Sequence, residues 1–412
     1  MKSQILSIGD ELLIGQVINT NAAFIAKKLN AVGIEVIRTL TVGDDEAEIQ
    51  SAFASSFASF DVTIVTGGLG PTHDDITRKA VCDFFETDLI LDASVLDHIR
   101  KLFEKRNFTW TAIAEDQALV PRTAQVIPNP LGTAPGMLFD RSGKYLIVLP
   151  GVPYEMERMM EDTVVPFFES KTGKAVIHRT IKTTGISESL LAQKLGDIPA
   201  MIGPAKLAFL PSPTGVRLRI THVTEERLGG GALVSRIETE IRAKAGMYIY
   251  GTDDEEIEAV VGGLLREHHQ TLAVAESITG GLIANRVTNV AGSSDYFLYG
   301  VTSYSNNSKS TILDVPTELL KAHGAVSREV AEAMAHGVRL ICGASIGLST
   351  TGIAGPSGGS AEKPVGTVWI GYSTELETIA LKFNFGEGRL RVKERAAQAA
   401  LDLLRRKILK LE

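Results

Sequence analysis

The chain has 412 residues, of which 44% are hydrophobic and 22% charged, and its formal net charge is −7. These values exclude a disordered chain and indicate about three globular domains of ordinary size. The negative charge argues against a general nucleic-acid or membrane-surface binder. No apolar run reaches the roughly 18 residues of a membrane helix.

The chain contains two cysteines, Cys82 and Cys342. They are too few for a disulfide framework or a multi-cysteine zinc site, and they suit a reducing compartment. Met1-Lys2 leads at once into a strand-like segment, so we expect no signal peptide and a cytoplasmic protein. The dense basic cluster near the end of the chain predicts a solvated helix face. That cluster comprises Arg405, Arg406, Lys407 and Lys410.

The first predicted domain, residues 1–168, alternates between strand and helix patterns. The predicted strands are 5–8, 35–42 and 62–66, and the predicted helices are 21–32, 46–57 and 76–85. Such alternation indicates a parallel sheet with helices on both faces. In sheets of this kind, ligands bind at the carboxyl ends of the strands.

A glycine-rich loop, TGGLGPTHDD at 66–75, follows the third predicted strand. It is neither a P-loop nor a dinucleotide fingerprint, but its glycines can form a backbone cradle for phosphate. Asp74 and Asp75 would repel a bare phosphate, so they fit a divalent cation that neutralises a pyrophosphate. The alternative is that both aspartates only support the start of the next helix.

The motifs GDELLIGQ, NTN, TGGLGPTHDD, NPLGTAPG and PGVPYEM together resemble the molybdopterin-binding (MoaB/Mog) fold, in the version found in CinA proteins. The resemblance implies metal-dependent hydrolysis of ADP-ribose to AMP and ribose 5-phosphate. The pyrophosphate would be bound by Gly67, Gly68, Gly70 and Thr72. The metal or water would be bound by Asp10, Glu11, Asp44, Asp74 and Asp75. Mg, Mn and Co all fit as the divalent metal, and potassium is a further candidate.

The second predicted domain, residues 169–254, is a small α+β connector. Its predicted strands are 178–183, 206–210, 216–223 and 247–250, and its predicted helices are 188–195 and 233–245. In CinA proteins this region is similar to K-homology (KH) domains. Because the segment has no GxxG loop between helices and no aromatic–basic platform, we expect a spacer and no RNA binding.

The third predicted domain, residues 255–412, begins with a strand at 272–275 that runs straight into a helix starting near Ser277. Such an elbow would place the Ser277 hydroxyl at the positive end of the helix, beside backbone N–H groups with no intrahelical partner. Gly280 and Gly281 would let a substrate approach the backbone closely. Acyl transfer needs such a nucleophile and such donors. The alternative, that Ser277 or Thr279 only caps the helix, is the commoner use of these residues.

A serine nucleophile without a histidine partner needs another base, and a lysine near a tyrosine can supply one. Tyr304 and Lys309 follow the next predicted strand and are the candidates. The remaining elements predict a three-layer α/β sandwich. They are helices at 327–342 and 390–411 and strands at 297–304, 344–350, 368–372 and 378–385.

The motifs AESITGG, GSSDYFLYGVTSYSNNSK, GAVS, GIAGPSGG and EKPVGTVW resemble, in this order, the C-terminal domain of the CinA family and the stand-alone nicotinamide mononucleotide (NMN) deamidases. The resemblance implies hydrolysis of NMN to nicotinate mononucleotide and ammonia, without a cofactor. Ser277 would be the nucleophile, and Tyr304 and Lys309 its activating partners. The substrate would be bound by Glu276, Thr279, Gly280, Gly281, Gly352, Gly355, Gly358, Gly359 and Lys363.

One position departs from the family pattern. The family usually has cysteine where this chain has Ile278. We expect this side chain to face the core, because a position just after a nucleophile usually offers its backbone.

The whole sequence predicts a two-activity hydrolase of pyridine-nucleotide recycling that forms a homodimer and binds the small-molecule nucleotides NMN and ADP-ribose. It predicts neither a nucleic acid nor a membrane as a partner. Two alternatives stay open. One is a molybdopterin-binding protein of cofactor synthesis, and the other is a non-enzymatic partner protein linked to competence and DNA damage.

Overall fold

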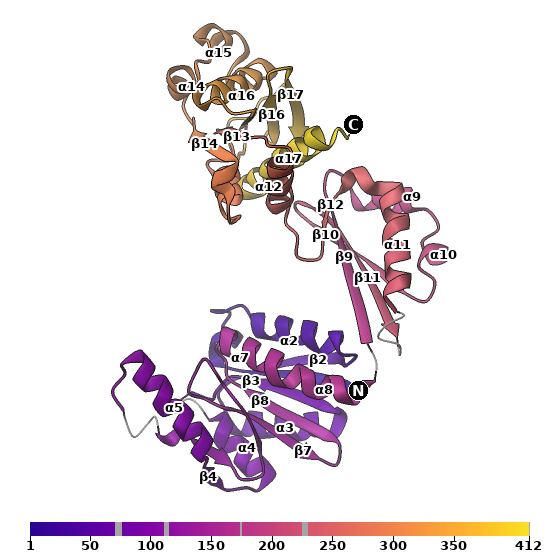
Figure 1. Cartoon of the computed structure of the whole chain (residues 1–412), viewed down its shortest axis with the longest axis vertical. Helices are drawn as coiled ribbons and strands as arrows, with labels where there is room; N and C mark the ends of the chain where they lie inside the picture. The colour runs from indigo at the N-terminus through magenta and orange to yellow at the C-terminus, as the bar shows by residue number, and fades with distance from the viewer. Residues whose placement is uncertain (71–75, 111–114, 174, 225–229, 412) are drawn as a thin grey trace. The chain divides into compact units, whose positions relative to one another are not determined.

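The computed structural model describes residues 1–70, 76–110, 115–173, 175–224 and 230–411 (Figure 1). The chain divides into two compact units. The first comprises Met1–Ile177 and His222–Gly231, and the second comprises His178–Thr221 and Ala232–Glu412. Most of the connector therefore belongs to the same unit as the C-terminal domain.

The first unit is built on a six-stranded sheet of order β2-β1-β3-β8-β7-β6. Its strands are β1 (Lys2–Ile8), β2 (Glu35–Val42), β3 (Val62–Thr66), β6 (Gln125–Ile127), β7 (Gly136–Arg141) and β8 (Lys144–Leu149). The first four strands in this order are parallel, while β7 and β6 add an antiparallel edge that the sequence analysis did not foresee.

Helices cover both faces of this sheet. They include α2 (Thr20–Ala31), α3 (Glu46–Ser59), α4 (Thr77–Phe85), α7 (Pro153–Met159), the π-helix Met160–Val164 and α8 (Val165–Thr172). Successive residues of a strand point to opposite faces. Ile5 accordingly packs in the core with α2 and α7, and Leu6 in the core with α3 and α4. The predicted parallel three-layer domain is confirmed.

The described residues of this unit also form smaller elements. They are α1 (Asp10–Leu13), α5 (Ala93–Arg106) and the antiparallel pair of β4 (Leu89–Leu91) and β5 (Leu119–Pro121).

The connector contains a four-stranded sheet of order β10-β11-β9-β12. Its elements are β9 (Ala175–Thr183), α9 (Glu188–Leu195), α10 (Ile198–Ile202), β10 (Lys206–Ser212), β11 (Gly215–Thr224), α11 (Gly230–Ala245) and β12 (Ile249–Thr252). The predicted strand at 247–250 begins later, because Gly246–Tyr248 forms a 3-10 turn.

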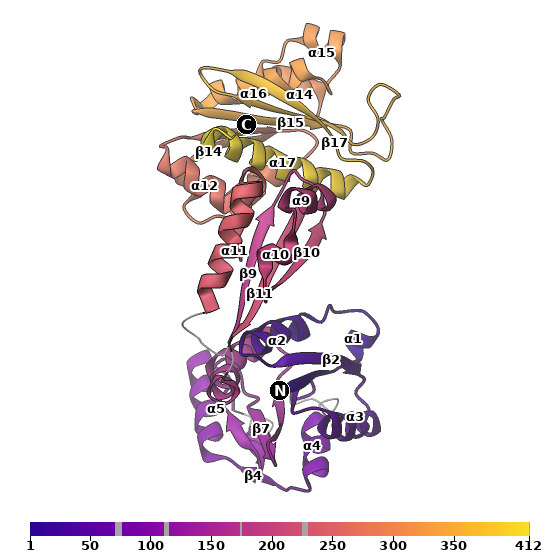
Figure 2. The same ribbon diagram turned by 90° about the vertical axis from the view of Figure 1, so that its right-hand side faces the viewer.

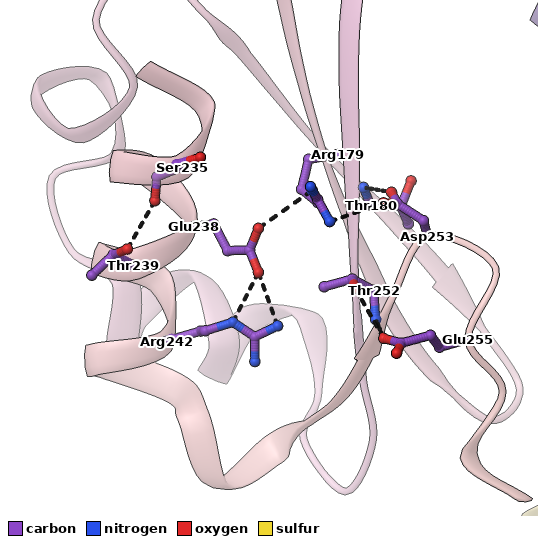
Figure 3. Close-up of polar contacts among 9 residues, drawn as sticks. All are labelled: Arg179, Thr180, Ser235, Glu238, Thr239, Arg242, Thr252, Asp253 and Glu255. Atoms are coloured by element: carbon purple, nitrogen blue, oxygen red, sulfur yellow. Dashed lines mark hydrogen bonds and ion pairs between the residues drawn. The ribbon is translucent and has the colours of Figure 1, made fainter. Parts of the chain in front are cut away.

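Ion pairs hold α11 and Asp253, the residue that follows β12, to β9 (Figure 3). Arg179 Nε lies 3.3 Å from a carboxylate oxygen of Glu238, and Arg179 Nη1 lies 3.0 Å from one of Asp253. The Glu238 carboxylate also accepts a hydrogen bond from Arg242 within α11.

The C-terminal domain is built on a five-stranded sheet of order β14-β13-β15-β16-β17. The strands are β13 (Leu272–Glu276), β14 (Phe297–Thr302), β15 (Ile346–Gly352), β16 (Thr367–Ser373) and β17 (Thr378–Asn384). β13 is parallel to both of its neighbours, whereas β16 is antiparallel to both β15 and β17.

Two helical layers enclose this sheet, with α16 and α17 on opposite faces (Figure 2). The helices are α12 (Ile257–Glu267), α13 (Leu282–Thr288), α14 (Asn306–Leu313), α15 (Thr317–His323), α16 (Arg328–Cys342) and α17 (Arg389–Leu409), with a 3-10 turn at Ser293–Asp295. Leu272 and Val274 pack in the core with α12 and α17, while Ala273 and Ala275 pack against α16. The predicted sandwich is confirmed.

The prediction of a solvated basic face on the last helix is wrong for Arg405, which is 2% exposed. Its guanidinium pairs with Asp402 at 2.8 Å and donates to the carbonyl oxygens of Met247 and Ile249. A buried charge is tolerated when paired in this way. Within the described residues, no helix is long and apolar enough to cross a membrane.

Candidate functional site

Ser277 and Lys309 meet at the carboxyl ends of β13 and β14. Ser277 follows β13 directly, and Lys309 lies on α14, just after β14. Lys309 Nζ is 3.2 Å from Ser277 Oγ, 2.8 Å from the Ser303 carbonyl oxygen and 3.3 Å from the Tyr304 carbonyl oxygen. Both side chains are buried, Lys309 at 1% and Ser277 at 8% exposure. The structure thus brings the predicted nucleophile and the predicted base into hydrogen-bond contact.

The burial of Lys309 changes its chemistry. Removal from water disfavours the ammonium form and lowers the pKa of Lys309 from 10.5 to about 8. About a tenth of the Lys309 side chains are then neutral amines at pH 7, and a neutral amine can accept the Ser277 hydroxyl proton. This is the arrangement of a serine nucleophile with an adjacent general base.

Tyr304 contributes to this network through its backbone. Its ring is 63% exposed, and its hydroxyl accepts a hydrogen bond from Arg389 Nη2 at 3.0 Å. Arg389 Nη1 also donates to the Gly355 carbonyl oxygen at 3.1 Å. Arg389 therefore connects Tyr304 to the segment GIAGPSGG, residues 352–359, which is called the glycine loop below. A role of the Tyr304 hydroxyl in activating Ser277 stays a prediction. Arg389 was not predicted as a site residue, and its one signal in the sequence is its place at the start of the last helix.

The predicted elbow differs from the observed one. Helix α13 begins at Leu282, not near Ser277, and the carboxylate of Glu276 occupies its positive end. Glu276 accepts the N–H groups of Gly281 at 2.9 Å, Ile283 at 3.1 Å and Ala284 at 2.8 Å. The expected placement of Ser277 beside free helix N–H groups is therefore wrong, and so is the alternative that Ser277 or Thr279 caps this helix, because the N-cap residue is Gly281.

The side chains of Glu276 and Thr279 have partners within the protein, and their substrate-binding roles stay predictions. Glu276 is 1% exposed and uses its carboxylate on the backbone, while the wholly buried Thr279 hydroxyl lies 2.7 Å from the Thr350 hydroxyl. Gly280 (φ 62°) and Gly281 (φ 92°) adopt left-handed conformations that favour glycine. These two residues end the strand-to-helix turn and delay the helix start.

Ile278 lies in the hydrophobic core, as expected. It is 6% exposed and belongs to the cluster formed with α12 and α17. Its Cδ1 atom would lie 2.7 Å from a Cβ added at Gly352, so its side chain packs directly under the start of the glycine loop.

The glycine loop and Lys363 lie after β15. The loop returns along residues 363–366, where the N–H of Gly366 donates to the Ile353 carbonyl oxygen. A Cβ at Gly359 would lie 2.8 Å from the Val365 nitrogen. Lys363 Nζ donates to the His323 carbonyl oxygen at 2.7 Å. The roles predicted for Lys363 and for Gly352, Gly355, Gly358 and Gly359 stay predictions.

The first unit has a cavity of about 720 Å³ at the carboxyl ends of β1, β2 and β3. It is lined by five of the predicted site residues, which are Asp10, Glu11, Asp44, Gly67 and Gly68. A Cβ at Gly67 would collide with the Ile8 carbonyl oxygen, so this wall of the cavity requires glycine. Gly70 does not line the cavity, and Thr72, Asp74 and Asp75 lie outside the described residues.

Asn19 and Asn21 also line this cavity, and the sequence analysis assigned them no role. Asn21 Nδ2 donates to the Gly151 carbonyl oxygen at 2.8 Å and lies 3.2 Å from the Thr66 hydroxyl oxygen. The motif NTN was the available signal.

The described carboxylates do not by themselves fit a metal centre. Across the described ranges, no three His, Cys, Asp or Glu side chains are grouped so that they could hold an ion. Asp10 and Asp44 instead accept each other's backbone N–H groups at 3.2 and 3.1 Å. The predicted metal site therefore depends on Asp74 and Asp75.

Comparison with known proteins assigns the family. A CinA-like protein of Salinibacter ruber is 44% identical over 409 residues, which cover 98% of this chain and 99% of that protein. The chain belongs to the CinA family. A CinA-like protein of Chloroherpeton thalassium is also 44% identical, over 98% of this chain and 99% of its own length.

Three family models match consecutive segments of this CinA-family chain. They are "Probable molybdopterin binding domain" at 4–170, "Damage-inducible protein CinA KH domain" at 178–251 and "CinA C-terminal domain" at 254–408. A solved structure of a competence/damage inducible protein from Agrobacterium tumefaciens is 36% identical, with a TM-score of 0.35. The matched region covers 36% of this chain and 94% of the Agrobacterium tumefaciens protein chain.

Proposed function

We propose that this CinA-family chain is a hydrolase with two nucleotide sites, and that its C-terminal site deamidates NMN. The observation that carries the proposal is the 3.2 Å contact between Ser277 Oγ and the buried Lys309 amine. A hydroxyl beside a partly neutral amine suits attack on an amide carbon.

The reaction would proceed in two halves. Ser277 Oγ attacks the carboxamide carbon of NMN while neutral Lys309 takes the hydroxyl proton. When the tetrahedral intermediate collapses, Lys309 returns this proton to the leaving nitrogen, and ammonia departs. Water then attacks the acyl–Ser277 ester, again with Lys309 as base, and releases nicotinate mononucleotide.

Backbone donors would stabilise the oxyanion of the tetrahedral intermediate. In the described part of the chain, the N–H groups of Thr279 and Gly280 form no hydrogen bond with a protein acceptor. They belong to the turn that follows Ser277, together with the Ile278 N–H, which also forms no such bond within the described residues and is the nearest of the three to Ser277 in sequence. The first turn of α13 is already used by Glu276.

We propose ADP-ribose hydrolysis for the first unit. The cavity of about 720 Å³ combines a glycine wall for a pyrophosphate with Asp10, Glu11 and Asp44 at the strand ends. A divalent cation would offset the phosphate charge, and Asp74 and Asp75 would complete its ligands. The bound cation would supply charge stabilisation for phosphoryl transfer.

The name of the N-terminal family model favours a second candidate, binding of molybdopterin in the same cavity. Recovery of molybdopterin with the purified protein, without turnover of ADP-ribose, would support this candidate. Binding of a recombination protein, with neither nucleotide hydrolysed, would instead support a non-enzymatic competence partner.

Incubation of the purified chain with NMN and, separately, with ADP-ribose tests the proposal, with identification of the products by mass spectrometry. We expect nicotinate mononucleotide and ammonia from the first substrate, and AMP and ribose 5-phosphate from the second. An unchanged NMN pool would contradict the deamidase assignment.

A further inference from the structure

The carboxylate of Glu276 bridges the turn that carries Ser277 through hydrogen bonds to backbone N–H groups. Glu276 is the last residue of β13, and it accepts N–H groups from Gly281, Ile283 and Ala284 at 2.8–3.1 Å. It is 1% exposed, so these bonds form away from water. A carboxylate at the start of a helix is stabilised both by such bonds and by the helix dipole.

The same residue is fixed on its strand side. The Glu276 carbonyl oxygen accepts the Ser303 N–H at 2.8 Å, and the Ser277 N–H donates to the Thr350 carbonyl oxygen at 2.9 Å. Both ends of residues 277–280 are therefore anchored, one by the sheet and the other by the Glu276 side chain.

The Lys309 side of the site shares these anchors. Ser303, which donates its N–H to Glu276, also accepts a hydrogen bond from Lys309 Nζ through its carbonyl oxygen. Glu276 thus lies one residue from the nucleophile and one hydrogen bond from a residue that holds the base. A displacement of the turn would move Ser277 Oγ relative to Lys309 Nζ.

We propose that Glu276 is a positioning residue for the deamidase reaction, and that its three hydrogen bonds to the first turn of α13 hold Ser277 Oγ against Lys309. This role rests on the proposed NMN deamidation. Glu276 does not touch the substrate and exchanges no proton in this scheme. Its effect is geometric, because a displacement of about 1 Å at a reacting group can cost on the order of 100-fold in rate.

The substitution Glu276→Gln tests the role with little change in shape. The amide oxygen can still accept N–H groups, but the amide nitrogen is a donor that faces another donor, so the turn must shift. We expect kcat for NMN to fall about 100-fold while KM changes less than about threefold. Wild-type kcat in this variant would overturn the proposal.

Glu258→Gln is the matched control. Glu258 is a partly buried carboxylate of the same domain that pairs at 2.7 Å with Arg286, in the last turn of α13. Its loss should lower the melting temperature of the domain without a comparable loss of kcat. If both variants lose kcat in proportion to their fall in melting temperature, Glu276 acts only on stability and the proposal is wrong.

A second readout separates this proposal from the deamidase assignment. Phenylmethylsulfonyl fluoride reacts with an activated serine: Oγ bonds to sulfur, fluoride leaves and Lys309 takes the proton. We expect sulfonylation of Ser277 to slow in Glu276→Gln by about the same factor as kcat. If the wild type does not hydrolyse NMN but Glu276→Gln still slows sulfonylation of Ser277, the proposed substrate is wrong and the positioning role stands. If neither reaction occurs in the wild type, both proposals fail.

Hydrogen exchange of the wild-type protein needs no variant and covers the case in which Glu276→Gln does not fold. N–H groups in the first turn of a helix normally exchange quickly, because they have no intrahelical acceptor. Those of Gly281, Ile283 and Ala284 should instead be as protected as N–H groups in the middle of α16. Fast exchange at these three positions would show that the hydrogen bonds to Glu276 do not hold the turn.

Discussion

The two candidate sites differ in how much of their chemistry the protein supplies by itself. At the C-terminal site, the proposed base is Lys309, and the nucleophile and the carbonyl oxygens that orient this base lie within 3.3 Å of its Nζ. At the N-terminal site, a cavity of about 720 Å³ is lined by carboxylates, two of which bind backbone N–H groups. A site whose base is an amine can be complete without a bound ion, whereas a pyrophosphate site with acidic walls needs a cation. The proposed reactions should therefore respond differently to substitutions, metal removal and pH.

The largest effect is expected from Lys309→Met. The change keeps an unbranched buried side chain but removes the only proposed base, so kcat for NMN should fall by at least about 1,000-fold. Ammonia release measures this effect. ADP-ribose hydrolysis is the internal control and should not change. Retention of more than about a tenth of the deamidase rate would exclude Lys309 as the base.

Asp75→Asn should have the opposite selectivity to Lys309→Met: it should impair ADP-ribose hydrolysis and spare NMN deamidation. It deletes one charge with little change of shape, so ADP-ribose hydrolysis should fall about 100-fold or more while NMN deamidation persists. Addition of a metal chelator to the wild type should have the same selective effect. Loss of NMN hydrolysis in chelator, or full ADP-ribose turnover in Asp75→Asn, would contradict the proposed separation.

The pH dependence of NMN hydrolysis should report Lys309. Burial lowers the pKa of this side chain to about 8, and the base must be deprotonated to act. Thus kcat/KM should rise about tenfold per pH unit below pH 8 and level off above it. A pH–rate profile from pH 6 to 9.5 checks this expectation. A rate that falls as pH rises through 8 would be inconsistent with a lysine base.

The smallest effect on catalysis is expected from Ile278→Cys, which restores the residue usual in the family. Ile278 packs in the core beside Gly352, so the smaller side chain should lower the free energy of unfolding by about 1–3 kcal/mol. Denaturant unfolding measures the loss. The value of kcat/KM for NMN should hardly change, and a large gain would place this side chain in the substrate pocket.

The layers of both large domains could be predicted because their signal is local. Strand and helix patterns alternate along the chain, and the structure places the small residues of β13, Ala273 and Ala275, on the face that packs against α16. The pairing of Ser277 with Lys309 was also predictable, through motifs at the ends of neighbouring strands. These features depend on residues close in sequence or on the register of adjacent strands.

The features that were not predicted depend on contacts that form only in the folded structure. From the sequence, Glu276 was predicted to bind the substrate. Its contacts with the backbone become evident only because α13 starts at Leu282, five residues after Ser277. Arg389 lies 85 residues from Tyr304, and no local pattern connects them. The burial of Arg405 could not be foreseen either, because helical periodicity does not reveal which carbonyl oxygens will face a helix.

The most direct test of the account is to incubate Ser277→Ala and the wild type with NMN, measuring ammonia release and protein mass after a rapid acid quench. If Ser277 is the nucleophile, the variant loses at least about 1,000-fold in rate, because removing a nucleophile leaves only binding and oxyanion stabilisation. A nicotinate mononucleotide ester should also form on the Ser277 peptide of the wild type alone. Ammonia release by Ser277→Ala at the wild-type rate would contradict the assignment of the C-terminal site.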